Sequence, residues 1–218
     1  PALLITKATG TLISTPTTQD PDGREGDRTH QQASNELPDC PHFRRVVTMA
    51  TLERAVKAVG PFRLFGKVVE GFKRGSKELG WPTANLDPAA FEEKLDDSAS
   101  EGVYIGWASI EDESLGVPSR TIHKAILSIG WNPFYKNEKR TVEAYLCHDF
   151  GRDFYGAEMR LLVCACIRPQ ADFSSMDELI KAIQDDVDYG SAALGAPPLS
   201  LLQEDDFFPS AKAPAPSS

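Results

Sequence analysis

The feature that most constrains this chain is a series of short apolar runs that follow one another with no helical pattern between them. Each run is bounded by Gly, Pro or Asn clusters, which is typical of β-strands. The runs are Leu64–Val69, Val103–Ile110, Lys124–Ile129, Thr141–Cys147 and Met159–Ile167. Consecutive strands without intervening helices favour an antiparallel barrel or sandwich over a parallel sheet. The sequence therefore predicts an all-β core.

The last strand and the segment after it carry the clearest periodic patterns. Alternate positions of the strand are apolar, the period of one buried face: Met159, Leu161, Val163, Ala165 and Ile167. Ser175 and Glu178 then form an S-x-x-E capping box, which marks a helix start. Apolar residues follow at helical spacing: Met176, Leu179, Ile180, Ile183 and Val187. This stripe predicts a helix that packs on the outside of the barrel.

The two ends of the chain are predicted to lie outside the folded domain. Residues 1–60 form a largely disordered N-terminal extension, because the stretch to about residue 48 is polar and interrupted by prolines. A short amphipathic helix is predicted from Ala50 to Val59, and Met49 is a candidate native start. The folded domain is predicted over 61–208, and a loose tail over 209–218.

Charge and hydropathy exclude several classes of partner. The net charge is −9, and the segment from residue 170 onward holds nine acidic and only two basic residues. This acidity argues against general nucleic-acid binding, which depends on neutralising phosphates. No run approaches the roughly 18 apolar residues of a membrane helix, and no signal peptide is visible. The prediction is a cytoplasmic monomer that binds neither nucleic acid nor membrane.

The cysteines indicate a reducing environment. Cys40, Cys147, Cys164 and Cys166 form no CxxC pair, and no His stands at zinc-finger spacing. Cys164 and Cys166 would share one face of a strand. A metal site and a pair of buried thiols are both open, and the thiols are favoured because Cys packs well as a small apolar group.

A glycine-rich basic loop, GFKRGSKELG, occupies residues 71–80. Its glycines permit close backbone approach, and Lys73, Arg74 and Lys77 add positive charge, which together suit a polyphosphate. The loop is not a Walker A motif, because Ser76 precedes Lys77. A solvated hairpin turn is the alternative interpretation.

The next segment, WPTAN at residues 81–85, offers oxygen ligands. Pro82 keeps the chain extended, so Thr83 and Asn85 would point to the same face. A hydroxyl and an amide oxygen side by side suit Mg²⁺, which retains several waters and binds phosphate oxygens. The alternative is a turn whose polar side chains cap backbone groups.

A candidate catalytic carboxylate lies on the strand that returns after the SIGWNPFYKN motif, residues 128–137. Alternation places Glu143 and Tyr145 on one face of this strand. The other face then holds Val142, Ala144 and Leu146. A carboxylate in the mouth of a barrel could accept a proton from an alcohol, although an exposed strand Glu is the commoner case.

Taken in order, these motifs resemble the riboflavin kinase family. The similar segments are GFKRGSKELGWPTAN, GVYIGWA, SIGWNPFYKN, the strand Glu, DFYG and IRP, from about Phe62 to Ala192, with a further similarity at EDDFF, residues 204–208. The resemblance implies a six-stranded antiparallel Greek-key barrel with a C-terminal α-helix packed outside. It also implies transfer of the γ-phosphate of ATP to the ribityl 5′-hydroxyl of riboflavin, giving FMN and ADP.

The resemblance assigns roles to individual residues. Glu143 would be the catalytic base. Thr83 and Asn85 would hold Mg²⁺, for which Zn²⁺ or Mn²⁺ are alternatives. The ATP-binding residues would be Gly71, Lys77, Thr83, Leu146, His148 and Tyr155. The flavin-binding residues would be Arg168, Ala171 and Phe173.

Some features depart from the family pattern or leave alternatives open. Ala144-Tyr145 stands where many relatives have Thr-His, and Ala171 where many have Lys, which bears on flavin contacts. The segment Glu111–Arg120 is predicted to be a surface hairpin. The roughly 60 residues before Pro61 are too few for an adenylyltransferase domain, so FAD synthesis is not expected.

Two rival functions are open. One is a non-enzymatic module that binds a flavin or a nucleotide, and the other is a barrel that binds single-stranded nucleic acid.

Overall fold

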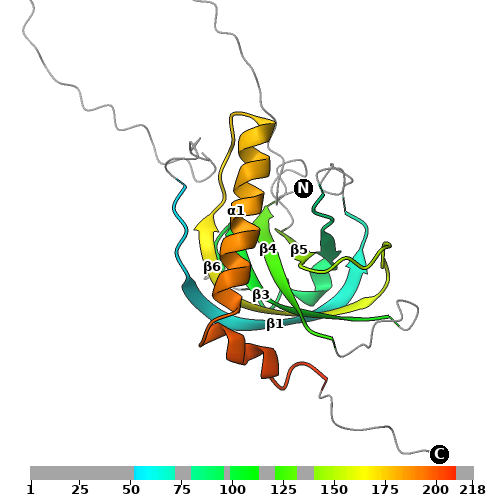
Figure 1. Cartoon of the computed structure of the whole chain (residues 1–218). Coiled ribbons are helices and arrows are strands. Elements are labelled where there is room, and N and C mark those ends of the chain that lie inside the picture. The colour runs from blue at the N-terminus through cyan, green and yellow to red at the C-terminus, as the bar shows by residue number, and fades with distance from the viewer. Residues whose placement is uncertain (1–51, 72–79, 96–98, 113–120, 132–139, 210–218) are drawn as a thin grey trace, which may run out of the picture.

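Six antiparallel strands close into a barrel in the computed structural model, which describes residues 52–71, 80–95, 99–112, 121–131 and 140–209 (Figure 1). The order around the barrel is β1-β2-β5-β4-β3-β6, and every neighbouring pair is antiparallel. The strands are β1 Lys57–Val69, β2 Ala84–Leu86, β3 Gly102–Glu111, β4 His123–Trp131, β5 Arg140–Leu146 and β6 Glu158–Pro169.

The strand order confirms the Greek-key prediction. Strands β3, β4 and β5 are consecutive neighbours, and β6 returns to pair with β3, which is the Greek-key arrangement. All five predicted runs lie in strands, except for Cys147, which follows the end of β5. The sixth strand, β2, is only three residues long and follows directly after Thr83. It joins β1 to β5 and so closes the barrel.

The barrel interior is filled by the inward-facing residues of all six strands. Leu64, Val68, Leu127, Ala144 and Leu161 are among its buried members. A short 3₁₀ helix, η2, spans Pro88–Ala90 after β2 and adds further buried apolar groups to this cluster. The interior is therefore a packed core.

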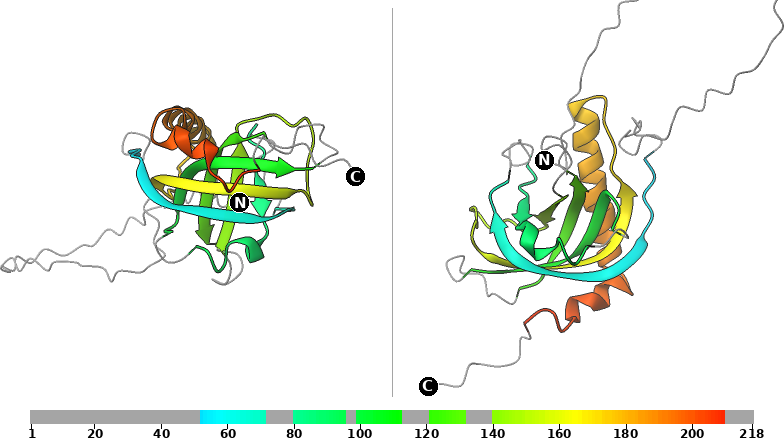
Figure 2. Two further views of the ribbon diagram at one scale, coloured as in Figure 1. Left: turned by 90° about the horizontal axis from the view of Figure 1, so that it is seen from below. Right: turned by 180° about the vertical axis from the view of Figure 1, so that it is seen from behind.

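A second apolar cluster lies on the outside of the barrel, under the helix α1, Met176–Leu194. Both views of Figure 2 show α1 against one side of the barrel. A Cβ at Gly190 would lie 2.6 Å from Cδ1 of Ile126 and 2.7 Å from Cγ2 of Ile105, so glycine permits this close approach. A 3₁₀ helix, η4 (Leu199–Glu204), continues the cover, and Trp107 donates from Nε1 to the Leu199 carbonyl at 3.0 Å. The predicted outside position of the helix is confirmed.

The start of α1 is capped largely as predicted. The Glu178 amide donates to Oγ of Ser175 at 3.2 Å. The Glu178 carboxylate accepts hydrogen bonds from Oγ of Ser174 at 2.6 Å and from the backbone amide of Ser174 at 3.1 Å. A reciprocal capping box would use the backbone amide of Ser175, one residue later. These hydrogen bonds hold the Glu178 carboxyl's pKa below its ordinary value.

The predicted helix over Ala50–Val59 is wrong for the residues that the structure describes. Residues 52–56 have no regular secondary structure, and β1 begins at Lys57. The Ala55 amide donates to the Ile167 carbonyl at 3.0 Å, so this segment continues the pairing with β6. Tertiary pairing therefore overrides the local helical pattern. Residues 1–51, with Cys40 and Met49, lie outside the described residues.

The predicted alternation along the last strand holds only for its first half. Met159, Leu161 and Val163 face the interior, but Ala165 and Ile167 belong to the outer cluster. The reason is a β-bulge: Ile105 pairs with Ala165 and Gly106 with Val163, so Cys164 is an extra residue. Because the bulge reverses the faces, the prediction that Cys164 and Cys166 share one face is wrong.

The described cysteines are free thiols, as favoured from the sequence. Cys164 packs in the outer cluster, and burial raises its pKa to about 12. Cys166 packs against the interior, on the other side of β6. The two thiols are therefore separated by the strand, and within the described ranges there is no cluster of three or more His, Cys, Asp or Glu side chains arranged for a metal.

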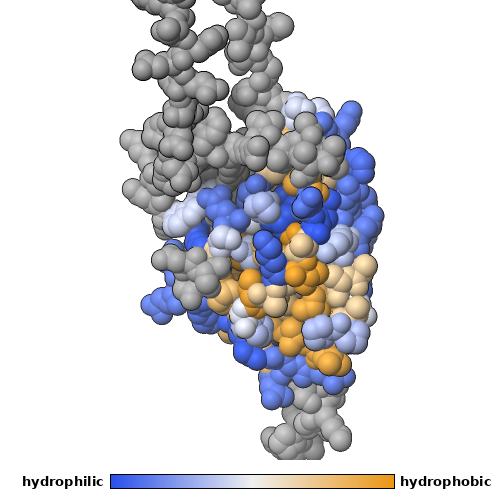
Figure 3. All heavy atoms as spheres, turned by 90° about the vertical axis from the view of Figure 1, so that its left-hand side faces the viewer, coloured by the Kyte–Doolittle hydropathy of each residue, from blue (hydrophilic) through white to orange (hydrophobic). Residues whose placement is uncertain are grey.

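Apolar side chains also reach the surface of the molecule. The side that faces left in Figure 1 carries a strip of hydrophobic residues bordered by hydrophilic ones (Figure 3). In the described part of the chain, no helix has the length and apolar content needed to cross a membrane.

Candidate active site

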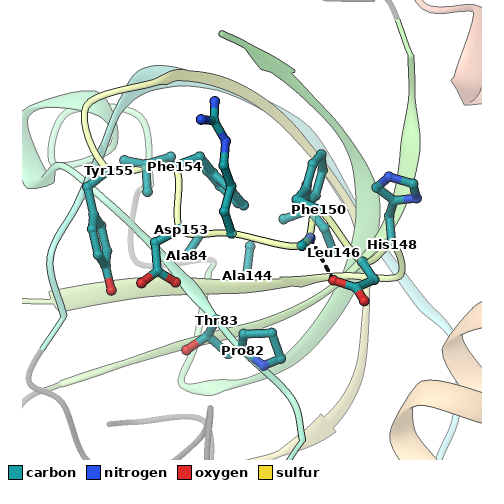
Figure 4. A pocket seen from close by; sticks show the side chains of 14 residues that line it. Pro82, Thr83, Ala84, Ala144, Leu146, His148, Phe150, Asp153, Phe154 and Tyr155 are labelled. Atoms are coloured by element: carbon teal, nitrogen blue, oxygen red, sulfur yellow. Dashed lines mark hydrogen bonds between the residues drawn. The ribbon is translucent and has the colours of Figure 1, made fainter. Parts of the chain in front are cut away.

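A cavity of about 340 Å³ opens at the rim of the barrel (Figure 4). Its walls come from the inner faces of β1, β2 and β5 and from the segment that connects β5 to β6. The lining residues are Val68, Pro82, Thr83, Ala84, Ala144, Leu146, His148, Asp149, Phe150, Gly151, Arg152, Asp153, Phe154 and Tyr155. This volume lies within the range of pockets that bind small molecules.

Aromatic contacts fix the connection between β5 and β6 over the cavity. His148 stacks on His123 with ring centroids 4.5 Å apart, and Phe150 meets His148 edge-on at 4.6 Å. Phe150 also contacts Phe154 at 4.9 Å. Burial, together with His148, lowers the pKa of His123 below its ordinary value, so the stacked His123 favours its neutral form. This side of the cavity is therefore apolar and aromatic.

Four of the predicted ATP-binding residues line this one cavity. Leu146 and His148 come from the end of β5 and the connection after it, Tyr155 from the far end of that connection, and Thr83 from the residue before β2. Figure 4 places His148 and Tyr155 at opposite sides, with Thr83 below. The Tyr155 side chain is exposed, so a flat apolar group could lie against it without repacking the core.

Three polar side chains form a row on the outer face of β2, β5 and β4. Asn85 on β2 pairs directly with Glu143 on β5, and Glu143 pairs directly with Ser128 on β4. Residues directly opposite in a ladder share a face, so these three side chains are neighbours. We call Asn85, Glu143 and Ser128 the outer row. Glu143 is 2% exposed and Ser128 is fully buried.

The alternation predicted for the glutamate strand is confirmed. Val142, Ala144 and Leu146 belong to the interior cluster, whereas Tyr145 belongs to the outer one. Glu143 lies on the outer face with Tyr145. The strands β2 and β5 therefore form a wall with the cavity on one side and the outer row on the other.

The predicted metal and phosphate residues meet at the edge of this wall. A Cβ at Gly71 would collide with Nδ2 of Asn85, so the Gly71 backbone lies against the Asn85 side chain, which would have to move to admit a larger residue. Thr83 precedes β2 and lines the cavity, while Asn85 joins the outer row. Lys77, like Lys73 and Arg74, lies outside the described residues. The structure thus brings Gly71 and Asn85 together, with Thr83 two residues away.

The predicted shared face of Thr83 and Asn85 is not observed, because Thr83 lines the cavity whereas Asn85 joins the outer row. Each of the two side chains carries one neutral oxygen, a type of ligand that suits Mg²⁺, a hard ion that keeps its waters and binds substrate phosphates. Structural zinc sites instead use four Cys, His or carboxylate ligands.

Arg168, a predicted flavin-binding residue, is buried in an ion pair with α1. Its Nη2 donates to Oδ2 of Asp186 at 2.6 Å, and its Nε to Oδ1 at 2.9 Å. Arg54 reaches the same Oδ1 at 2.7 Å, so two cations meet on one buried carboxylate. Arg168 pairs with Val103, which pairs with Ser128, so this ion pair continues the outer row across the barrel.

The other two predicted flavin-binding residues follow β6. Phe173 packs with Trp81 against a small cluster on α1, formed by Leu179 and Ile183. The Arg168 guanidinium lies 5.9 Å from the Phe173 ring centroid. Ala171 stands two residues before Phe173 and is partly buried. The predicted flavin residues therefore lie near α1, on the same side as the outer row and away from the cavity.

Several residues of the candidate site have no role among the predictions made from the sequence. Ser128 stands in the SIGWNPFYKN motif but had no role, and Gln170, which contacts it, follows the IRP motif. Asp149, Phe150 and Phe154 line the cavity. The cluster of aromatic and charged residues between two strands was a usable signal for a binding loop.

Comparison with known proteins defines the class to which this fold and site belong. The family model described as "Flavokinase: Riboflavin kinase" matches residues 59–194. The chain belongs to the riboflavin kinase family, whose members are transferases that form FMN.

Individual relatives agree with the family match. The riboflavin kinase of Mus musculus is 43% identical over 148 residues, which cover 68% of this chain and 90% of that protein. The bifunctional riboflavin kinase/FMN phosphatase of Arabidopsis thaliana is 42% identical over 150 residues, 69% of this chain but only 38% of that protein. The crystal structure of riboflavin kinase from Trypanosoma brucei has a TM-score of 0.54 at 31% identity, covering 73% of this chain and 96% of that one.

Proposed function

We propose that this chain transfers the γ-phosphate of Mg-ATP to the ribityl 5′-hydroxyl of riboflavin, giving FMN and ADP. The observation that carries the proposal is the division of β2 and β5 between a cavity on one face and the outer row on the other. Two substrates can then bind on opposite sides of one wall. Their reacting ends would meet at its edge, where Thr83 and Gly71 lie.

The nucleotide would occupy the cavity. The aromatic side formed by His148 and Phe150 suits a purine, and Tyr155 could cover its other face. The triphosphate would then pass Thr83 toward Asn85. The backbone at Gly71 approaches this point closely, as phosphate-binding loops do.

The flavin would lie on the outer side, near Trp81, Phe173 and α1. Its ribityl chain would run along the outer row toward Glu143, the only carboxylate among Asn85, Glu143 and Ser128. Glu143 would orient the terminal hydroxyl and accept its proton. Because Glu143 is almost completely buried, water has little access to compete for this contact.

Phosphoryl transfer depends on positioning and on electrostatic stabilisation more than on covalent chemistry by the protein. Thr83 and Asn85 would hold the magnesium ion, which supplies neutralisation of charge on the phosphate oxygens when it is bound. A small set of groups on one barrel can therefore support the reaction. The Mg²⁺ preference, a monomeric state and a cytoplasmic location are further predictions from the sequence.

A product assay tests the proposal. The purified chain is incubated with riboflavin, ATP and Mg²⁺, and flavins are separated by chromatography. Metal-dependent FMN with one ADP released for each FMN is the expected result. Flavin binding without phosphorylation would favour a binding module, and retention of single-stranded oligonucleotide at low salt would favour the nucleic-acid alternative.

A further inference from the structure

The aromatic side of the cavity is supported by a residue that lies behind it. His148 and Phe150 line the cavity, whereas His123, the first residue of β4, is not among the described residues that line it. The His123 ring stacks on the His148 ring with centroids 4.5 Å apart and an interplanar angle of 28°. It also meets the Phe150 ring edge-on at 5.3 Å. His123 therefore contacts both of the rings that form this side of the cavity.

The fold holds the two stacked histidines with different firmness. His123 is 9% exposed, and it pairs with Ala108 in the ladder between β4 and β3. His148 is exposed and belongs to the connection that follows β5. An exposed side chain on a connection has several rotamers open to it, whereas a buried side chain on a paired strand is confined. The stack with His123 consequently restricts the orientation of the His148 ring.

Backbone hydrogen bonds bring the two histidines together. The Cys147 amide donates to the Lys124 carbonyl at 2.8 Å, which joins the residue after β5 to the residue after His123. The His148 amide donates to the Leu146 carbonyl at 2.7 Å, an i→i+2 contact that turns the chain at the end of the strand. Both contacts use backbone groups alone. A change of the His123 side chain should therefore leave the path of the connection in place and release only the rings.

Charge does not oppose the stack. Burial, together with His148, lowers the pKa of His123, so the His123 ring is neutral near pH 7. A neutral ring can stack on His148 without like-charge repulsion. One face of the His148 ring is covered by His123, and the His148 side chain meets the cavity on its other side. A ring that is already oriented loses less freedom when a ligand binds, which raises affinity.

We propose that His123 is a positioning residue for the nucleobase: it holds the His148 ring in the orientation in which a purine stacks on it. The proposal rests on the proposed function, in which the nucleotide occupies the cavity. His123 acts through His148 and does not touch the substrate. Its effect falls on the base and not on the triphosphate, because the phosphates pass Thr83, which Figure 4 places below the aromatic side.

The test is His123→Leu, which fills the space with an apolar side chain but has no flat ring. Two competitive inhibitors separate the parts of the nucleotide: adenosine probes the base side, and inorganic tripolyphosphate with Mg²⁺ probes the phosphate side. We expect Ki for adenosine to rise roughly fivefold, because the support of one aromatic contact is lost. Ki for tripolyphosphate, KM for riboflavin and kcat should each change less than about twofold.

Three further variants separate positioning from general structural support. His123→Phe keeps a flat ring and should hold Ki for adenosine within about twofold of the wild type. Phe207→Ala removes one ring of another aromatic pair, which Phe207 forms with Phe208 at 5.6 Å outside the described lining of the cavity, and should leave that Ki unchanged. In a His148→Ala background, which lacks the ring that His123 holds, His123→Leu should have no additional effect.

Two results would overturn the role of His123. One is an unchanged Ki for adenosine in His123→Leu, and the other is an equal rise of Ki for adenosine and for tripolyphosphate. Failure of the proposed function has a different signature: the wild-type chain would make no FMN, or adenosine would not compete with ATP in the wild type. If His123→Leu does not fold, His123→Asn, which also lacks an aromatic ring, takes its place with the same expected rise.

Discussion

The two faces of β2 and β5 differ in chemistry although they belong to the same few residues. On the inner face, Ala84 and Ala144 are small and apolar, and the cavity lies over them. On the outer face, Asn85 and Glu143 are polar and stand directly opposite each other. Alternation along two short strands therefore separates the cavity from a row of polar side chains.

The two faces are also supported differently. The cavity is covered by the connection between β5 and β6, whose His148 and Phe150 pack against His123 of β4. The outer side depends on α1, which is held by the buried ion pairs of Asp186. A substitution on one side should consequently disturb one substrate more than the other. The predictions below test this separation, starting with the largest effect.

The largest effect is expected from Asp186→Ala. Arg168 and Arg54 would lose their shared carboxylate. Their side chains are 2% and 12% exposed, respectively. Breaking a buried ion pair by removing one partner costs about 3–5 kcal/mol, so the free energy of unfolding should fall by that amount. Urea unfolding followed by fluorescence measures it. KM for riboflavin should rise more than KM for ATP, because α1 supports the outer side.

Asp185→Ala is the matched control for this prediction. Asp185 neighbours Asp186 on α1, but its side chain is 33% exposed, its 3.0 Å ion pair is with the exposed Lys181, and its contact with Arg54 is long at 4.0 Å. Such pairs contribute about 0–1 kcal/mol, so stability should hardly change. If Asp186→Ala raises both KM values equally, the two sides are not supported independently.

The second prediction concerns the chemistry itself. Glu143→Gln preserves the shape of the outer row but removes the proton acceptor, so kcat should fall on the order of 10²-fold or more. KM for ATP should stay within about twofold, because Glu143 faces away from the cavity. Steady-state kinetics with both substrates varied measures this. Turnover near that of the wild type would remove Glu143 from the role of base.

The sequence sufficed to predict the parts of the fold that depend on local pattern. Apolar runs bounded by turn residues identified the strands, and the capping residue Ser175 located the helix start. The β-bulge at Cys164 was not predictable, because it depends on how β6 pairs with β3. The helix predicted near Ala55 failed for the same reason, since pairing with β6 decides the conformation there.

The site was predictable only residue by residue. Alternation along a single strand sufficed to predict that Glu143 lies on the opposite face from Ala144 and Leu146. That Asn85, Glu143 and Ser128 are neighbours depends on the register of three strands, and register is set by the whole barrel. The contact of Arg168 with Asp186 joins a strand to a helix and leaves no local signal.

The third prediction tests the cavity side. Tyr155→Ala removes an aromatic wall whose side chain is 53% exposed, so stability should change little. Loss of stacking on a purine is worth about 1 kcal/mol, and KM for ATP should rise roughly fivefold. KM for riboflavin should stay constant. Leu201→Ala, at an exposed apolar residue outside the cavity, is the control, and an equal response in both variants would contradict the assignment.

The smallest effect is expected from the pH dependence of stability at His123. Its folded-state pKa lies below the ordinary value, because of burial and the neighbouring His148, so protonation favours the unfolded chain. Stability is retained above the unfolded-state pKa, near 6.5, and is lost as the pH falls through it. The loss from this residue should be at most about 0.7 kcal/mol between about pH 7 and pH 6.

His123→Phe isolates this contribution. Phenylalanine keeps an aromatic ring in the stack with His148 and Phe150 but cannot be protonated. Urea unfolding of both proteins at the two pH values should therefore show a smaller loss of stability in the variant. If the wild type and the variant lose the same free energy of unfolding between the two pH values, His123 has the same pKa in the folded and unfolded chain. Protonation of His123 would then not destabilise the cavity side.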